Sequence, residues 1–159
     1  MDTHKVESIL ERVRNDGVQF ISLQFSDIFG NLKSVTIPVK RLPDSLTMGT
    51  WFDGSSIEGF ARICESDMLL RPDPDTYSPV PWRPREPGEA RMICDVYRPD
   101  GQPFEGDPRH ILKRALQRAA SLGYVYNVGP ELEFFLLERN GLKTMPSPHD
   151  PAGYFDLGP

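Results

Sequence analysis

Proline constrains the fold of this chain more than any other residue type. There are 16 prolines among 159 residues, and they concentrate at positions 72, 74, 79, 81, 84 and 87. Because proline fixes φ and has no backbone N–H, this segment can form neither a helix nor a central strand. Proline-rich segments also serve as ligands of partner proteins. The position of this one between two predicted strands favours an extended connector, which we expect Trp82 to hold against the domain.

The composition is that of a globular protein and argues against several functional classes. The chain is 38% hydrophobic and 26% charged. Its net charge is −5 and it has no basic stripe, which argues against a nucleic-acid partner. No apolar run is long enough to cross a membrane, and the polar N-terminus does not resemble a signal peptide. Cys64 and Cys94 match no metal or redox spacing, so we expect buried, reduced thiols in a cytoplasmic protein.

Apolar periodicity predicts a mixed α and β fold. The first two strands are separated by a turn at residues 26–31, so we pair them as a hairpin. Residues 39–46 are ambiguous, with a short helical turn around Pro43. The predicted elements are a helix at 4–14 and strands at 18–25, 32–38, 68–71 and 90–97.

A second long helix is expected from Pro108 to about Leu122. Asp107 is a suitable N-cap, Pro108 suits the first helical position, and Gly123 ends the helix. Its apolar side chains predict one buried face, and its basic side chains predict a solvated one. The apolar set is Ile111, Leu112, Ala115, Leu116 and Ala119, and the basic set is Arg109, Lys113, Arg114 and Arg118.

Residues 50–60 combine large aromatic side chains with Gly, Ser and two acids, among them Asp53. Gly permits unusual dihedral angles, and Asp and Ser bond the nearby backbone, so we expect a loop. A loop of this kind, anchored by aromatic residues, suits a functional site on a rigid scaffold. From composition alone, an Asp-Gly turn with structural Ser caps is the favoured interpretation.

The stretch 129–137 is short, apolar and aromatic, which predicts a strand. Alternation along a strand would place Glu131 and Glu133 on the same face, next to a core. Paired buried carboxylates need compensation, and a divalent cation such as Mg²⁺ or Mn²⁺ would supply it. The alternative is that the two carboxylates face solvent or meet Arg or Lys. For an isolated Glu-x-Glu pattern that alternative is favoured.

Taken together, five motifs in order along the chain resemble the prokaryotic type of the glutamine synthetase family. The Asp53 motif Phe-Asp-Gly-Ser-Ser-Ile-Glu-Gly-Phe resembles the family's Asp-containing loop, and Gly-Pro-Glu-Leu-Glu-Phe-Phe resembles its metal-binding strand. The others match the strand after the loop, the domain junction and the segment after the metal-binding strand. The motifs occupy residues 52–60, 65–73, 94–109, 129–135 and 153–156.

The resemblance implies an α+β fold with two domains. Residues 1–104 would form a β-grasp-like N-terminal domain, and residues 105–159 would begin a catalytic domain built on an antiparallel open barrel. Family members continue well beyond residue 159, and the tail at 145–159 completes no core. We therefore expect an N-terminal portion of a longer protein, inactive by itself.

The resemblance also implies an activity: ATP-dependent ligation of ammonia to L-glutamate through γ-glutamyl phosphate. Asp53 would bind ammonium and take its proton, with Ser56 supporting that site. Glu131 and Glu133 would each serve one ion of a two-metal site holding Mg²⁺ or Mn²⁺, with ATP as co-substrate. The Asp53 loop would reach into a neighbouring subunit of a ring, and full-length members are expected to form dodecamers.

Two other functions stay open. One is a family relative that joins a different amine to glutamate, although Asp53 and Ser56 favour ammonia. The other is a non-catalytic assembly or regulatory module.

Overall fold

A computed structural model describes residues 3–57, 59, 67–82, 88–137, 147, 152–153 and 155–157. The chain divides into two compact units, Met1–Val125 and Tyr126–Pro159. Among the described residues, no helix has both the length and the apolar character needed to cross a membrane. Cys64 lies outside the described residues, as do parts of the predicted loop and tail.

The first unit is built on a six-stranded mixed sheet with the order β2-β1-β6-β4-β3, and β5 pairs with β6. β1 and β6 form its parallel central pair, and the remaining pairs are antiparallel. The strands are β1 (Val18–Ser26), β2 (Leu32–Pro38), β3 (Thr50–Asp53), β4 (Asp67–Pro72), β5 (Ser78–Pro79) and β6 (Gly88–Tyr97). The predicted hairpin is confirmed, with Leu23 opposite Val35.

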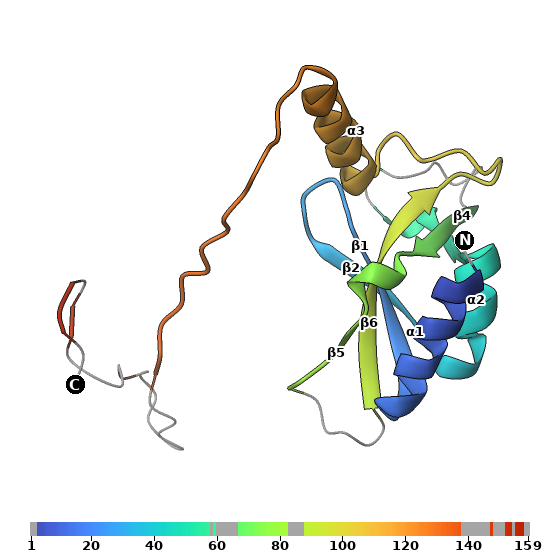
Figure 1. Ribbon diagram of the computed structural model, residues 1–159, viewed down its shortest axis with the longest axis horizontal. Coiled ribbons are helices and arrows are strands. Elements are labelled where there is room, and N and C mark those ends of the chain that lie inside the picture. Colours follow the sequence, from blue (N-terminus) through green and yellow to red (C-terminus); the bar gives the residue numbers. More distant parts are fainter. Residues whose placement is uncertain are drawn as a thin grey trace. The chain divides into compact units, whose positions relative to one another are not determined.

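Two helices cover one face of this sheet, α1 (Thr3–Asn15) and α2 (Leu42–Met48), as Figure 1 shows. A short 3₁₀ turn, η1 (Val39–Arg41), leads from β2 into α2. The core contains fully buried side chains from both helices and from the sheet, including Val13, Leu42, Ile21 and Leu70. This α+β arrangement confirms the predicted fold class for the first unit.

β6 has the alternation that its sequence predicts. Met92, Cys94 and Val96 are buried, whereas Asp95 and Tyr97 on the other face are half-buried. Burial raises the pKa of the Cys94 thiol, so it stays protonated at neutral pH. The expected buried, reduced thiol is therefore confirmed for Cys94.

The proline-rich connector holds a 3₁₀ turn, η4 (Pro74–Thr76), followed by the edge strand β5. The prediction that Trp82 anchors it is wrong, because this side chain is 80% exposed. Tyr77 is the buried aromatic instead. Its hydroxyl donates to Asp16 at 2.8 Å, and the Arg12 guanidinium lies 4.9 Å from its ring centroid.

The last helix of this unit, α3 (Pro108–Ser121), forms as predicted, but its apolar face is not buried. None of its residues is buried, and Ile111 and Leu112 of the apolar face are about half exposed. Arg109, which we expected in solvent, is half-buried and bonds Asp73 and Asp95, whereas Lys113 is exposed as expected and also bonds Asp95. Ion pairs of these two cations with Asp73 and Asp95 hold the start of the helix against the rest of the unit.

In the second unit, residues 129–136 do not form the predicted strand. Glu131 and Glu133 are exposed, as are the apolar side chains between and after them. A strand needs a neighbour for its N–H and C=O groups, and no described residue pairs with 129–136. The described residues therefore do not hold the two carboxylates beside a core, and their role as metal ligands stays a prediction.

Candidate functional site

Asp53 occupies the point where an edge strand becomes a 3₁₀ turn. It is the last residue of β3 and the N-cap of η2 (Gly54–Ser56). Its Oδ1 accepts two hydrogen bonds from Ser55, one from the backbone N–H at 2.9 Å and one from the hydroxyl at 2.6 Å. The turn closes with the Ile57 N–H donating to the Gly54 carbonyl at 3.0 Å. The predicted loop therefore begins at Gly54 rather than at Thr50, because residues 50–53 pair with β4.

The geometry keeps the Asp53 carboxylate ionised and accessible. The Ser55 hydroxyl and then the Ser55 N–H lower the pKa of Asp53, and burial opposes them only weakly. The side chain is exposed, and no described residue donates to its Oδ2. An ionised carboxylate with a free oxygen can attract a cation, and it can accept a proton once bonding to a substrate shifts its pKa.

The strand behind Asp53 is fixed by aromatic packing. Phe52 lies against Phe25 of β1, with ring centroids 5.0 Å apart, and Asp53 is opposite Asp67 of β4. Trp51 is 57% exposed on the same strand. The carboxylate is thus held on a rigid sheet edge, beside an exposed aromatic side chain.

The serine that touches Asp53 is Ser55, whereas the sequence analysis selected Ser56. Ser56 is exposed and its role stays a prediction. The spacing itself carried a signal for Ser55, because an Asp side chain commonly bonds the backbone N–H two residues later.

The described residues do not fit a metal ion by themselves. No group of three or more His, Cys, Asp or Glu side chains among them could hold one. Glu131 and Glu133 belong to the second unit, and Asp53 belongs to the first. The carboxylates predicted for the site therefore belong to separate units, and each is described by itself.

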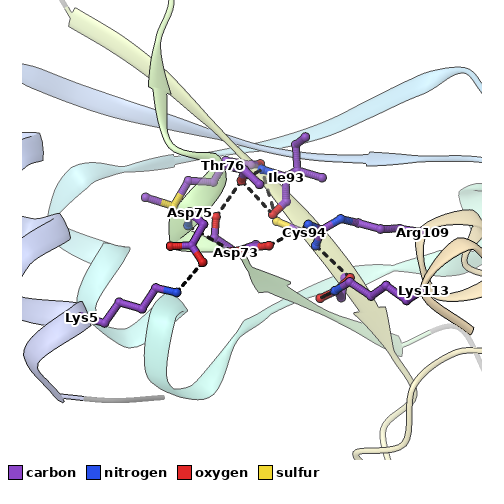
Figure 2. A network of polar contacts seen from close by, with 10 residues as sticks. Lys5, Asp73, Asp75, Thr76, Ile93, Cys94, Arg109 and Lys113 are labelled. Carbon is purple, nitrogen blue, oxygen red and sulfur yellow. Dashed lines mark hydrogen bonds and ion pairs between the residues drawn. The ribbon is translucent and has the colours of Figure 1, made fainter. Parts of the chain in front are cut away.

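A second polar cluster ties α3 to the sheet, as Figure 2 shows. Arg109 donates to Asp73 at 2.7 Å and to Asp95 at 2.9 Å, and Lys113 also bonds Asp95. Asp107 is 1% exposed and accepts from the Val96 and Arg109 N–H groups. The charges in this cluster compensate one another, and the bonds join α3 to β6 and Asp73. We therefore assign the cluster a structural rather than a catalytic role.

Comparisons with known proteins cover nearly the whole chain. The family profile described as "Glutamine synthetase, beta-Grasp domain" matches residues 17–99, and "Glutamine synthetase, catalytic domain" matches residues 105–157. The glutamine synthetase of Clostridium saccharobutylicum is 56% identical over 161 aligned positions, which cover 100% of this chain and 36% of that protein. That of Thermotoga maritima is 50% identical over 97% of this chain and 35% of its own length. The chain thus spans about a third of the curated relatives it matches.

Solved structures support the same fold. "GmaS/ADP complex-Conformation 1" is 28% identical with a TM-score of 0.65, over 72% of this chain and 26% of its own. "CryoEM Plasmodium falciparum glutamine synthetase" is 21% identical with a TM-score of 0.66, over 74% of this chain and 23% of that one.

Proposed function

Because the chain belongs to the glutamine synthetase family, we propose that its whole protein ligates ammonia to L-glutamate at the expense of ATP. The glutamate γ-carboxylate would attack the terminal phosphorus of ATP, giving γ-glutamyl phosphate and ADP. Ammonia would then attack the acyl carbon and release phosphate. The observation that carries this proposal is the exposed, ionised Asp53 carboxylate at the start of the family's loop motif.

Asp53 would act twice in the second step. Its negative charge attracts ammonium, and its free oxygen can then take a proton. The proton must leave first, because ammonium has no lone pair with which to attack. Ser55 would hold the carboxylate in place, and Ser56 would line the ammonium site.

Divalent ions and ATP are the cofactor and the co-substrate in this proposal. We assign Glu131 and Glu133 as carboxylate ligands of Mg²⁺ or Mn²⁺, with the other ligands supplied from outside the described residues. Such ions would neutralise phosphate charge during transfer. One similar structure is a complex with ADP, which supports a nucleotide substrate. We derive no catalytic step of this chain from the ions.

The assembly is also a proposal. We place a β-grasp domain at 1–104 and the start of the catalytic domain at 105–159. The whole protein would form cytoplasmic rings, dodecamers in the full-length form, in which the Asp53 loop completes a neighbour's site. The edge position of β3 in the sheet, with Trp51 exposed, supports such a contact.

The test is an Asp53→Ala substitution in the whole protein, with Asp44→Ala on the exposed surface of α2 as control. Loss of the base should lower ammonia-dependent turnover by about 10²- to 10⁴-fold, while formation of γ-glutamyl phosphate persists. Unchanged turnover would refute the role of Asp53. Preference for a larger amine over ammonia would favour an amine-ligating relative.

The chain itself provides a second test. Since its described residues make no metal site, titration with ATP and Mn²⁺ in a calorimeter should give weak binding or none, and no ligase activity. Robust turnover by the chain would contradict the assignment. Stable association with the full-length enzyme without turnover would favour an assembly module.

A further inference from the structure

The turn between β1 and β2 is organised around one buried carboxylate. Asp27 is 3% exposed, and its Oδ1 accepts from the N–H groups of Phe29 at 2.9 Å and Asn31 at 2.8 Å. Its Oδ2 accepts from the Asn31 side-chain amide at 3.1 Å and lies 3.5 Å from the Lys33 ammonium. Burial alone would disfavour the charge, but these bonds outweigh it and lower the pKa of Asp27. The turn is therefore tied together at neutral pH.

This turn contacts the Asp53 loop. A Cβ placed on Gly59 would lie only 2.5 Å from the Ile28 Cδ1, so the Gly59 backbone packs closely against that side chain. Gly59 also has φ of +80°, which a larger residue would rarely adopt. A few residues before the turn, Phe25 packs against Phe52. The hairpin thus contacts the chain on both sides of Asp53.

These contacts matter because the loop that follows Asp53 has few other anchors, although the strand before it is fixed to the sheet. Among the described residues, the Asp53 side chain bonds only Ser55, which lies within the same turn. Ile57 packs partly against the core, but Gly59 has φ of +80° and no side chain of its own. Ile28 is 48% exposed, so its loss leaves the core intact.

We propose that the Asp27-organised turn positions the Asp53 loop. Ile28 is the residue of this turn that restricts the loop, through its contact with Gly59. Ile28 touches no reacting group in this arrangement. It acts by restricting the loop that presents the carboxylate. The catalytic consequence rests on the role proposed for Asp53, whereas the restriction of the loop does not.

The test compares Ile28→Ala with Phe29→Ala in this chain. Phe29 is the adjacent residue of the same turn, it is 65% exposed, and only its backbone N–H bonds Asp27. Hydrogen exchange of the Ser55 and Ile57 amides, which are bonded within the loop, reports loop opening. We expect Ile28→Ala to raise both rates by roughly threefold to tenfold, and Phe29→Ala to leave them within twofold, roughly the scatter of local exchange.

The Asp53 carboxyl carbon gives a second readout by NMR titration. Since Ser55 lowers the pKa of Asp53, a looser loop should move that pKa upward in Ile28→Ala only. Ile28→Val keeps both γ carbons, which lie 3.0 and 3.2 Å from the Cβ position of Gly59, and should restore most of the protection. Equal exchange in all variants would overturn the proposal.

The kinetic consequence is measured separately in the whole protein. If Ile28→Ala loosens the loop and raises KM for ammonium, both proposals stand. If it loosens the loop without changing ammonium kinetics, the positioning of the loop stands and the role of Asp53 fails.

Discussion

Asp107, the N-cap residue of α3, accepts a hydrogen bond at 3.0 Å from the backbone N–H of Val96 on β6. Its other oxygen accepts from the Arg109 N–H at 3.0 Å and caps the helix. One buried carboxylate therefore joins the last strand of the sheet to the first turn of α3. Burial raises the pKa of Asp107, and the two backbone bonds oppose that rise.

Removing this carboxylate should destabilise the first unit. Asp107→Ala loses a helix cap and leaves the buried Val96 N–H without a partner, so we expect a loss of about 2–3 kcal/mol in the free energy of unfolding. Asp107→Asn keeps one acceptor and should lose about 1–2 kcal/mol. Urea titration followed by circular dichroism measures both. Asp100→Ala, at an exposed turn carboxylate, serves as control, and equal losses in all three variants would contradict the assignment.

Arg109 should be coupled energetically to Asp73. The guanidinium bridges Asp73 and Asp95, and the side chains of the Arg109–Asp73 pair are each about one quarter exposed. A double-mutant cycle with Arg109→Met and Asp73→Asn should give a coupling free energy of about 1–2 kcal/mol, above that of a typical surface pair. Arg109→Lys should recover only part of it, because an ammonium lacks the planar fork. If the loss in the double variant equals the sum of the losses in the two single variants, the bridge contributes no coupling free energy.

The Arg109–Asp73 pair makes the stability of the folded chain depend on pH. Burial disfavours the charged form of Asp73, but the Arg109 hydrogen bond, the Asp75 backbone N–H and the Arg109 charge together outweigh it and lower the pKa below the ordinary 3.8. A lowered folded-state pKa gives stabilisation that is complete above the unfolded value and is lost as pH falls through the folded value. Stability of the chain should therefore decline below about pH 4. Asp73→Asn should flatten this decline in thermal unfolding, whereas an unchanged acid limb would assign it to other groups.

Local signals predicted most of the first unit. Alternation identified β1, β2 and β6, and the Asp107-Pro108 pair identified the start of α3. The wrong predictions concern features that depend on residues far away in the sequence. The orientation of α3 depends on Asp73, which is 36 residues from Arg109, and the sequence around the helix contains no trace of that pairing. The predicted strand at 129–137 depends on neighbours that the described residues do not provide.

At the candidate site, the sequence identified Asp53 but not its surroundings. The partner hydroxyl belongs to Ser55 rather than Ser56. The support from Ile28 spans about thirty positions in the chain and brings a hairpin turn against a glycine. Apolar residues in turns carry no periodic pattern, so sequence alone could not relate the two.

The exposed apolar face of α3 gives the last prediction. Leu112 is 53% exposed although it belongs to the apolar face of the helix, whereas Leu70 in the sheet is completely buried. Leu112→Gln should therefore change the free energy of unfolding of this chain by less than about 0.5 kcal/mol, because little apolar surface is removed from water at that position. Leu70→Ala removes buried carbon and leaves a cavity, so we expect a loss of about 2–5 kcal/mol. Parallel urea titrations of the two variants distinguish the orientation described here from one in which the apolar face is buried. A loss above about 1.5 kcal/mol for Leu112→Gln would mean that this face packs against the protein.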